Sequence, residues 1–280
     1  MLDMSNKLRF GLDIPASTGV DPVAAARAAE DLGYDFVSTS DHPSGTDPTH
    51  EVWTMLAWMA AHTSRIGVMS RVLGVPYRNP AMVAKMAETL DRLSGGRLIL
   101  GLGGGHSDEE FRAFGIGVPS PRDKVDGLAE AIEIMRGLWT GPAFTYPGRL
   151  HHVAAAPMEP KPARRIPIWL GTFGPRALAV TGRLADGWMP SLGYAPLDQL
   201  PVMRDRIAAA ADQAGRSIDD ITCALNVEVR PADLDEPGRL AERLRDLTAM
   251  GFTVLNLKPA GPGREETVER LAREVLPEVI

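Results

Sequence analysis

Residues 94–106 read SGGRLILGLGGGH and combine a buried-strand pattern with residues that could do chemistry. A turn signal precedes an apolar run, which is typical of a strand buried on both faces. Gly103 and Gly104 belong to the glycine cluster that follows, and glycine lets a backbone approach a ligand closely. His106 then supplies a side chain that titrates near neutral pH. The pattern fits an active-site loop and a tight strand-to-helix turn equally well. A G-x-G-x-x-G dinucleotide motif starting at Gly101 is disfavoured, because His106 stands where the last glycine belongs.

Two further strand ends carry ionisable side chains. Asp41 and His42 follow an apolar run, and a carboxylate beside an imidazole can hold it for proton transfer. The alternative is that Asp41 caps a turn and His42 contacts solvent. Asp13 lies inside the apolar stretch LRFGLDI, where a buried carboxylate is costly unless it has a partner or stays protonated. It is either an acid near a ligand or a group that satisfies the backbone of the core.

A fourth strand end has the composition of an anion site. Gly171, Thr172, Phe173 and Gly174 follow an apolar run, and Pro175 then opens a helix. The free N–H groups at a helix N-terminus favour a phosphate of a cofactor or substrate. An ordinary glycine turn is the alternative, since such loops often contain glycine.

Strand and helix patterns alternate along the whole chain, which indicates a parallel sheet. Eight such units in 280 residues predict an α/β fold of the (β/α)8 TIM-type barrel class, with a doubly wound open sheet as the competitor. We expect a single domain over residues 1–280, with a hairpin inserted at 144–153. In a barrel, the candidate residues above would meet at the carboxyl ends of the strands. The predicted strands are 8–14, 36–40, 66–73, 98–102, 168–171, 187–189, 221–228 and 254–258.

Composition excludes several classes of function. The net charge is −6 without a basic stripe, so nucleic-acid binding is disfavoured. No apolar run is long enough to span a membrane, and the N-terminus does not resemble a secretion signal. The single cysteine, Cys223, suits a reducing cytoplasm. The six histidines show no metal-ligand spacing, so no metal site is predicted, although scattered ligands leave a metal-dependent hydrolase barrel as a lower alternative.

Seven segments carry a further signal: FGLDIP, AAEDLGYDFVSTSDH, YRNPAMVAKMAETLDRLSGGRLILGLGGG, FRAFGI, DGLAEAIEIMRGLWTG, IPIWLGTFGPRALAVTGRLADGW and REVLPEV. Taken together, they resemble the luciferase-like monooxygenase superfamily, and within it the branch that uses the deazaflavin coenzyme F420. The resemblance covers about residues 8–276 and is specific for the superfamily, but it discriminates poorly between F420 and FMN.

The resemblance implies a TIM-type barrel with an inserted hairpin and a deazaflavin ring at its mouth. In deazaflavin-dependent sugar-phosphate dehydrogenases an aspartate and a catalytic histidine end the second strand, and Asp41 and His42 match them. Those enzymes carry a glutamate where this chain has His106, which puts sugar-phosphate activity in doubt. A carboxylate on the first strand of related reductases lies near the ring, and Asp13 matches it.

The resemblance also implies a non-prolyl cis peptide bond within residues 69–72, expected at Ser70–Arg71, beside the ring. Phosphate contacts map onto Thr172, Phe173 and Gly174. A lysine that relatives use after the sixth strand is not evident in PSLGYAP.

The predicted function is therefore F420-dependent hydride transfer between the deazaflavin C5 and a small organic substrate. The candidates for catalysis are His42, His106 and Asp13, in that order, with Asp41 orienting His42 or bonding the ring edge. The candidate cofactor contacts are Asp41, Ser70, Arg71, Gly103, Gly104, Gly171, Thr172, Phe173 and Gly174. An FMN-dependent monooxygenase is the first alternative, and a cofactor-binding protein without catalysis is another. A homodimer is an expected assembly, since relatives often dimerise through barrel helices.

Overall fold

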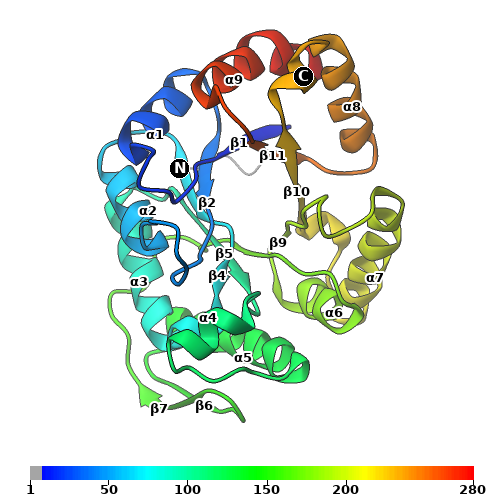
Figure 1. Ribbon diagram of the computed structural model, residues 1–280. Coiled ribbons are helices and arrows are strands. Elements are labelled where there is room, and N and C mark those ends of the chain that lie inside the picture. The colour runs from blue at the N-terminus through cyan, green and yellow to red at the C-terminus, as the bar shows by residue number, and fades with distance from the viewer. Residues whose placement is uncertain (1–7) are drawn as a thin grey trace.

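The computed structural model describes residues 8–280, and strands surrounded by helices dominate it (Figure 1). Within these residues, eight strands form a ring. They are β1 Arg9–Asp13, β2 Phe36–Thr39, β3 Gly67–Ser70, β5 Leu98–Gly103, β8 Ile168–Leu170, β9 Gly187–Trp188, β10 Thr222–Val229 and β11 Val254–Pro259.

The ring of strands is closed and wholly parallel. Its order is β3-β2-β1-β11-β10-β9-β8-β5, and β3 also pairs with β5. The closing register places Val68 opposite Leu98 and Met69 opposite Ile99. The predicted (β/α)8 barrel is thereby confirmed, and the open doubly wound sheet is wrong. Because all strands run the same way, their carboxyl ends share one rim.

The predicted strand 66–73 is interrupted. β3 ends at Ser70, and a separate strand, β4 Leu73–Gly74, pairs with the end of β5. Between them lies a non-prolyl cis bond at Arg71–Val72, one bond later than the expected Ser70–Arg71. The reason is local: the Arg71 N–H continues the ladder by donating to Thr39 O at 2.8 Å, so the break follows Arg71.

The helix α1, Pro22–Asp31, begins where its capping residues predict. The Asp21 carboxylate accepts hydrogen bonds from the N–H groups of Val23 and Ala24, with Pro22 in the first position of the helix. Residues Leu271–Val275 form a π-helical turn between the last two helices. The helices are α1 Pro22–Asp31, α2 Val52–Ala61, α3 Pro80–Leu93, α4 Asp108–Ala113, α5 Pro121–Thr140, α6 Pro175–Leu184, α7 Leu200–Gln213, α8 Pro237–Ala249, α9 Arg264–Arg270 and α10 Leu276–Val279.

The interior of the barrel is apolar at one level and polar at the next. Side chains alternate along a strand, so Phe36 and Ser38 both point inward from β2, one layer apart. Around Phe36 lies a buried cluster that fills the lower barrel, whereas Ser38, Asn226 and Asn256 form a polar layer above it. The apolar cluster is Phe36, Met69, Ile99, Trp169, Met189, Ala224 and Val254.

The predicted hairpin is present outside the barrel. β6 Phe144–Pro147 pairs antiparallel with β7 His152–Ala156, so the hairpin extends three residues beyond the predicted end at 153. Between residues 8 and 280, no helix has both the length and the apolar character needed to cross a membrane.

Glu30 ties α1 to the loop that leads into β3. Its Oε1 accepts hydrogen bonds from the N–H groups of Ser64 at 2.9 Å and Ile66 at 2.8 Å, and also from that of Arg65. Burial alone raises the pKa of Glu30, but these backbone donors outweigh it and hold the pKa below its ordinary value of 4.5.

Replacing Glu30 with glutamine is expected to lower the free energy of unfolding by about 1 kcal/mol at pH 7, because charge-assisted hydrogen bonds are lost. A carboxyl whose pKa is depressed on folding stabilises above its unfolded pKa, and this contribution disappears as pH falls through the folded value. Urea unfolding at pH 7 and pH 3 measures the difference, with Glu269→Gln on the exposed face of α9 as control. An equal loss at both pH values would contradict this account.

Candidate active site

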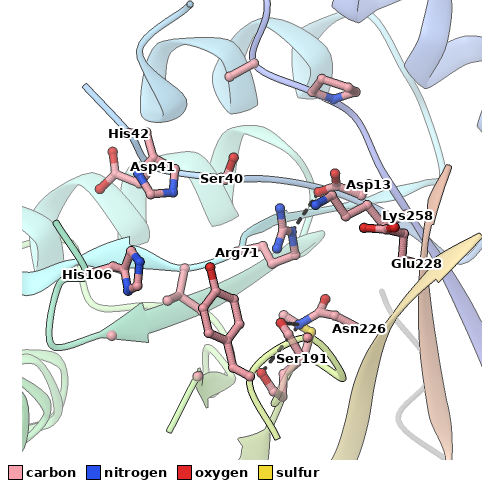
Figure 2. A pocket seen from close by; sticks show the side chains of 18 of the residues that line it. Asp13, Ser40, Asp41, His42, Arg71, His106, Ser191, Asn226, Glu228 and Lys258 are labelled. Carbon is pink, nitrogen blue, oxygen red and sulfur yellow. Dashed lines mark hydrogen bonds and ion pairs between the residues drawn. The ribbon is translucent and has the colours of Figure 1, made fainter. Parts of the chain in front are cut away.

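A cavity of about 1370 Å³ opens at the carboxyl ends of the barrel strands (Figure 2). Most of the predicted site residues line it: Asp13, Asp41, His42, Arg71, Gly103, Gly104, His106, Gly171 and Phe173. Figure 2 shows His42 and His106 on one side, Glu228 and Lys258 on the other, and Arg71 between them. Small-molecule sites commonly measure about 300–1,000 Å³, so the cavity has room for two ligands.

Asp13 and Arg71 form an ion pair on the cavity wall. The Arg71 Nε lies 2.7 Å from Asp13 Oδ1, and both side chains are largely buried. The Ser38 hydroxyl donates to the same oxygen at 3.3 Å, and Arg264 donates to the Asp13 backbone carbonyl. Asp13 is therefore a buried carboxyl group with an ion-pair partner on the cavity wall.

Asp41 is held by partners other than His42. Arg78 binds its carboxylate with two nitrogens, at 2.7 and 3.1 Å, and the Gly74 N–H donates to it at 2.9 Å. Arg78 also pairs with Glu51. The prediction that Asp41 orients His42 is therefore wrong, because its oxygens are committed to the segment after β3. A contact between Asp41 and a cofactor stays a prediction.

His42 has a different carboxylate partner. Its Nδ1 lies 2.9 Å from Glu110 Oε1, and the Tyr77 hydroxyl donates to Glu110 Oε2 at 2.6 Å. Sequence patterns did not identify Glu110, Tyr77 or Arg78, since each pairs with residues 33 to 68 positions away. The only signal for Glu110 is its place in an acidic first helical turn, which also has a plain helix-capping explanation.

His106 stands at the exposed rim among aromatic rings. Its ring centroid lies 5.5 Å from that of Tyr194 in an edge-on arrangement, and Tyr194 lies 5.9 Å from Phe173. These three side chains come from loops after β5, β8 and β9, and all line the cavity. The His106 side chain is exposed, whereas Glu110 is buried. His106 is therefore placed to meet a ligand that enters from solvent.

Three predicted contacts, Ser70, Thr172 and Gly174, are not among the residues that line the cavity. The Ser70 hydroxyl donates to Gly101 O at 2.8 Å and accepts from Gly101 N–H at 3.1 Å, so it joins β3 to β5. The Thr172 hydroxyl lies 2.7 Å from that of Thr181 in α6. Gly174 precedes Pro175 at the start of α6, and its helix end has no side-chain cap. A phosphate at that helix end stays a prediction.

The far wall of the cavity carries charges that the sequence patterns did not single out. Glu228 on β10 and Lys258 on β11 are opposite each other in the parallel register. Beneath them, Asn256 donates to Asn226 at 2.7 Å, and Asn226 donates to Ser191 at 3.1 Å. The signal for these residues is present in the sequence, since they are polar positions inside otherwise apolar strands.

Gly103, the last residue of β5, and Gly171, directly after β8, pack closely against Val72. A Cβ on Gly103 would lie 2.6 Å from Val72 Cγ2, and one on Gly171 would lie 3.3 Å from it. The expectation that Gly103 lets the backbone approach a ligand closely is corrected, because Val72 lies against that position. Val72 itself lines the cavity and offers it an apolar surface.

Changing Gly103 to alanine is expected to destabilise the fold by about 1–3 kcal/mol, because the new methyl group overlaps Val72. The double variant Gly103→Ala/Val72→Ala should recover much of this loss. Gly193→Ala, at a cavity-lining position where an added Cβ meets nothing within 4 Å, is the matched control. Urea unfolding measures all three, and a double variant no more stable than the single one would rule out the overlap.

Burial, followed by the hydrogen bond to Glu110, raises the pKa of Tyr77 far above its ordinary value, so its phenol stays protonated. Among residues 8–280, no group of three or more His, Cys, Asp or Glu side chains is arranged to hold a metal ion.

The closed parallel barrel with a polar cavity at its strand ends defines a TIM-barrel protein with its site at the usual face. Residues 15–269 match the luciferase-like monooxygenase family, and the chain belongs to that family.

Curated relatives share the sequence over most of this chain. An F420-dependent glucose-6-phosphate dehydrogenase of Nakamurella multipartita is 32% identical over 284 residues, which cover 96% of this chain and 80% of the relative. Other relatives of the same name are matched over 61% to 76% of their own length.

Solved structures share the fold at lower identity. An F420-dependent secondary alcohol dehydrogenase in complex with an F420-acetone adduct has a TM-score of 0.88 and 18% identity, covering 98% of this chain and 99% of that one. The monooxygenase RslO1 from Streptomyces bottropensis has a TM-score of 0.82 and 21% identity, covering 98% and 100%.

Proposed function

We propose that the protein is an F420-dependent oxidoreductase that transfers a hydride between the deazaflavin C5 and a small organic substrate. The observation that carries the proposal is the histidine held by a buried carboxylate at the mouth of a barrel of this family. The name of the 32% identical relative supports F420 as the cofactor. The secondary alcohol dehydrogenase with the same fold supports a substrate that cycles between alcohol and carbonyl.

The residues around the cavity fit a planar cofactor. Val72 offers an apolar surface between β5 and β8, and the N–H groups at the start of α6 suit an anionic group beside Phe173. Arg71 and Lys258 add positive charge to the cavity wall. When bound, the deazaflavin supplies a two-electron hydride acceptor at its C5.

The chain's own groups would handle the proton and the substrate. His42 is the proposed proton acceptor for a hydroxyl substrate and the proton donor in the reverse direction. His106 at the rim is the second candidate for a substrate contact. Asp13 acts in this proposal by fixing Arg71, whose guanidinium faces the cavity.

The test is anaerobic turnover with F420 and a panel of secondary alcohols, lactols and sugar phosphates. Turnover is measured as the loss of the visible absorbance of the oxidised deazaflavin. We expect at least one hydroxyl substrate to reduce F420 at a rate proportional to enzyme concentration. Cofactor binding without turnover across the panel would instead favour a non-catalytic binding protein.

An FMN-dependent monooxygenase is the second candidate, favoured by the fold shared with RslO1. It predicts oxygen consumption with reduced FMN, whereas the F420 proposal predicts turnover without oxygen. Turnover that requires oxygen and FMN would replace the first proposal with the second.

A further inference from the structure

Glu110 lies buried directly behind His42. It comes from α4, it is only 8% exposed, and it is not part of the cavity wall, although His42 is. Its Oε1 meets His42 Nδ1 at 2.9 Å and its Oε2 accepts from the Tyr77 hydroxyl at 2.6 Å. The carboxylate therefore contacts the Nδ1 side of the imidazole without itself lining the cavity.

Several contacts fix the position of this carboxylate. The Ser107 hydroxyl caps α4 by accepting from the Glu110 N–H at 3.3 Å. The Tyr77 ring packs on the fully buried Phe111 ring, with 5.0 Å between centroids. Lys124 pairs with Asp108 at 2.8 Å rather than with Glu110. Hydrogen bonds with the Tyr77 and Ser107 hydroxyls thus hold Glu110 in place, and its Oε1 faces His42.

The contact with Glu110 points to one tautomer of the His42 ring. An ionised carboxylate only accepts hydrogen bonds, so the nitrogen that meets Glu110 must be an N–H. In the neutral imidazole, Nε2 then keeps its lone pair. Asp41, the neighbour in sequence, does not take this part, because Arg78 and Gly74 occupy its carboxylate.

We propose that Glu110, seated by Tyr77, is the positioning residue that holds His42 in the Nδ1–H form, so that Nε2 accepts the hydroxyl proton of an alcohol substrate. In that step the C–H bond of the alcohol breaks and its hydride, with two electrons, passes to the deazaflavin. The O–H proton passes to His42 Nε2, and a carbonyl product forms. The kinetic consequence rests on the proposed function, whereas the protonation pattern of His42 does not.

The first test uses the apoprotein and needs neither cofactor nor substrate. Nitrogen-15 NMR correlation of the imidazole rings, with His42 assigned from the His42→Asn spectrum, reports the tautomer. We expect the Nδ1–H form in the wild-type protein and a shift to a mixture or to Nε2–H in Glu110→Gln. Glu109→Gln, the exposed neighbour on the same helix, should leave the spectrum unchanged.

The second test measures turnover with F420. Glu110→Gln is expected to lower kcat by about 100-fold, with little change in KM for F420, because a misplaced proton weakens general-base catalysis. Tyr77→Phe should lower kcat less, by about 3–10-fold, and Glu110→Asp should recover part of the loss. Circular dichroism checks that each variant folds, and Tyr77→Phe keeps the test usable if Glu110→Gln does not.

The outcomes separate the two proposals. An unchanged His42 tautomer in folded Glu110→Gln overturns the positioning role, even if the enzyme turns over F420, and an unchanged kcat in Tyr77→Phe overturns the part assigned to Tyr77. A changed tautomer in a protein that never reduces F420 supports the positioning role and removes the proposed function. Loss of kcat in Glu110→Gln that is matched by Glu109→Gln also overturns the inference.

Discussion

Replacing His42 with asparagine is expected to lower kcat for F420 reduction by about 10²–10⁴-fold, the range typical of losing a general base. Asparagine keeps a polar group of similar reach towards Glu110 but cannot accept a proton. His42 contacts Glu110 and lines the cavity, and about half of its side chain is exposed, so packing is little affected. Binding of F420 should therefore stay within a few-fold of the wild-type value.

Steady-state kinetics with a saturating hydroxyl substrate, combined with fluorescence titration of F420, measure the two quantities separately. His152→Asn in the exposed hairpin strand β7 is the matched control and should leave both unchanged. A His42→Asn variant with kcat within three-fold of the wild type would remove His42 from the proton-transfer step.

Replacing Arg78 with methionine is expected to lower the free energy of unfolding by about 3–5 kcal/mol, because it leaves a buried carboxylate without its cation. Asp41 is almost fully buried, and Arg78 is the only cation that binds its carboxylate among the described residues. Burial lowers the pKa of Arg78, but the ion pairs with Asp41 and Glu51 outweigh it and raise that pKa. The guanidinium therefore stays charged and committed to this site.

Urea unfolding measures the loss for Arg78→Met. Arg122→Met, which removes an exposed pair with Asp126, should cost less than about 1 kcal/mol. The double variant Asp41→Asn/Arg78→Met removes the stranded charge and should recover part of the stability. A loss for Arg78→Met no larger than that for Arg122→Met would show that Asp41 does not depend on this cation.

The barrel was predictable because its signals are local. Apolar runs such as residues 98–102, followed by glycine or polar residues, mark each strand and its carboxyl end. Once the strands are known to be parallel, their ends must meet, and this alone placed Asp13, His42 and His106 at one cavity. The inserted hairpin was recognisable from its central Pro-Gly turn.

The partners of the site residues were not predictable in the same way. His42 adjoins Asp41 in sequence, yet consecutive residues of an extended segment point apart, and its carboxylate comes from Glu110. The glycine at 103 was interpreted as space for a ligand, whereas the structure places Val72 there. Such contacts depend on how separate loops fold onto one another, and residue periodicity carries no information about that.

The cavity is expected to take F420, and competitive binding to the apoprotein tests this most directly. Equimolar F420 and FMN are titrated against the protein under anaerobic conditions, with fluorescence reporting each ligand. We expect one F420 per chain with a Kd of about 1 μM or tighter, near −8 kcal/mol, and FMN bound at least about 100-fold more weakly. Tight stoichiometric FMN binding with no measurable binding of F420 would contradict it.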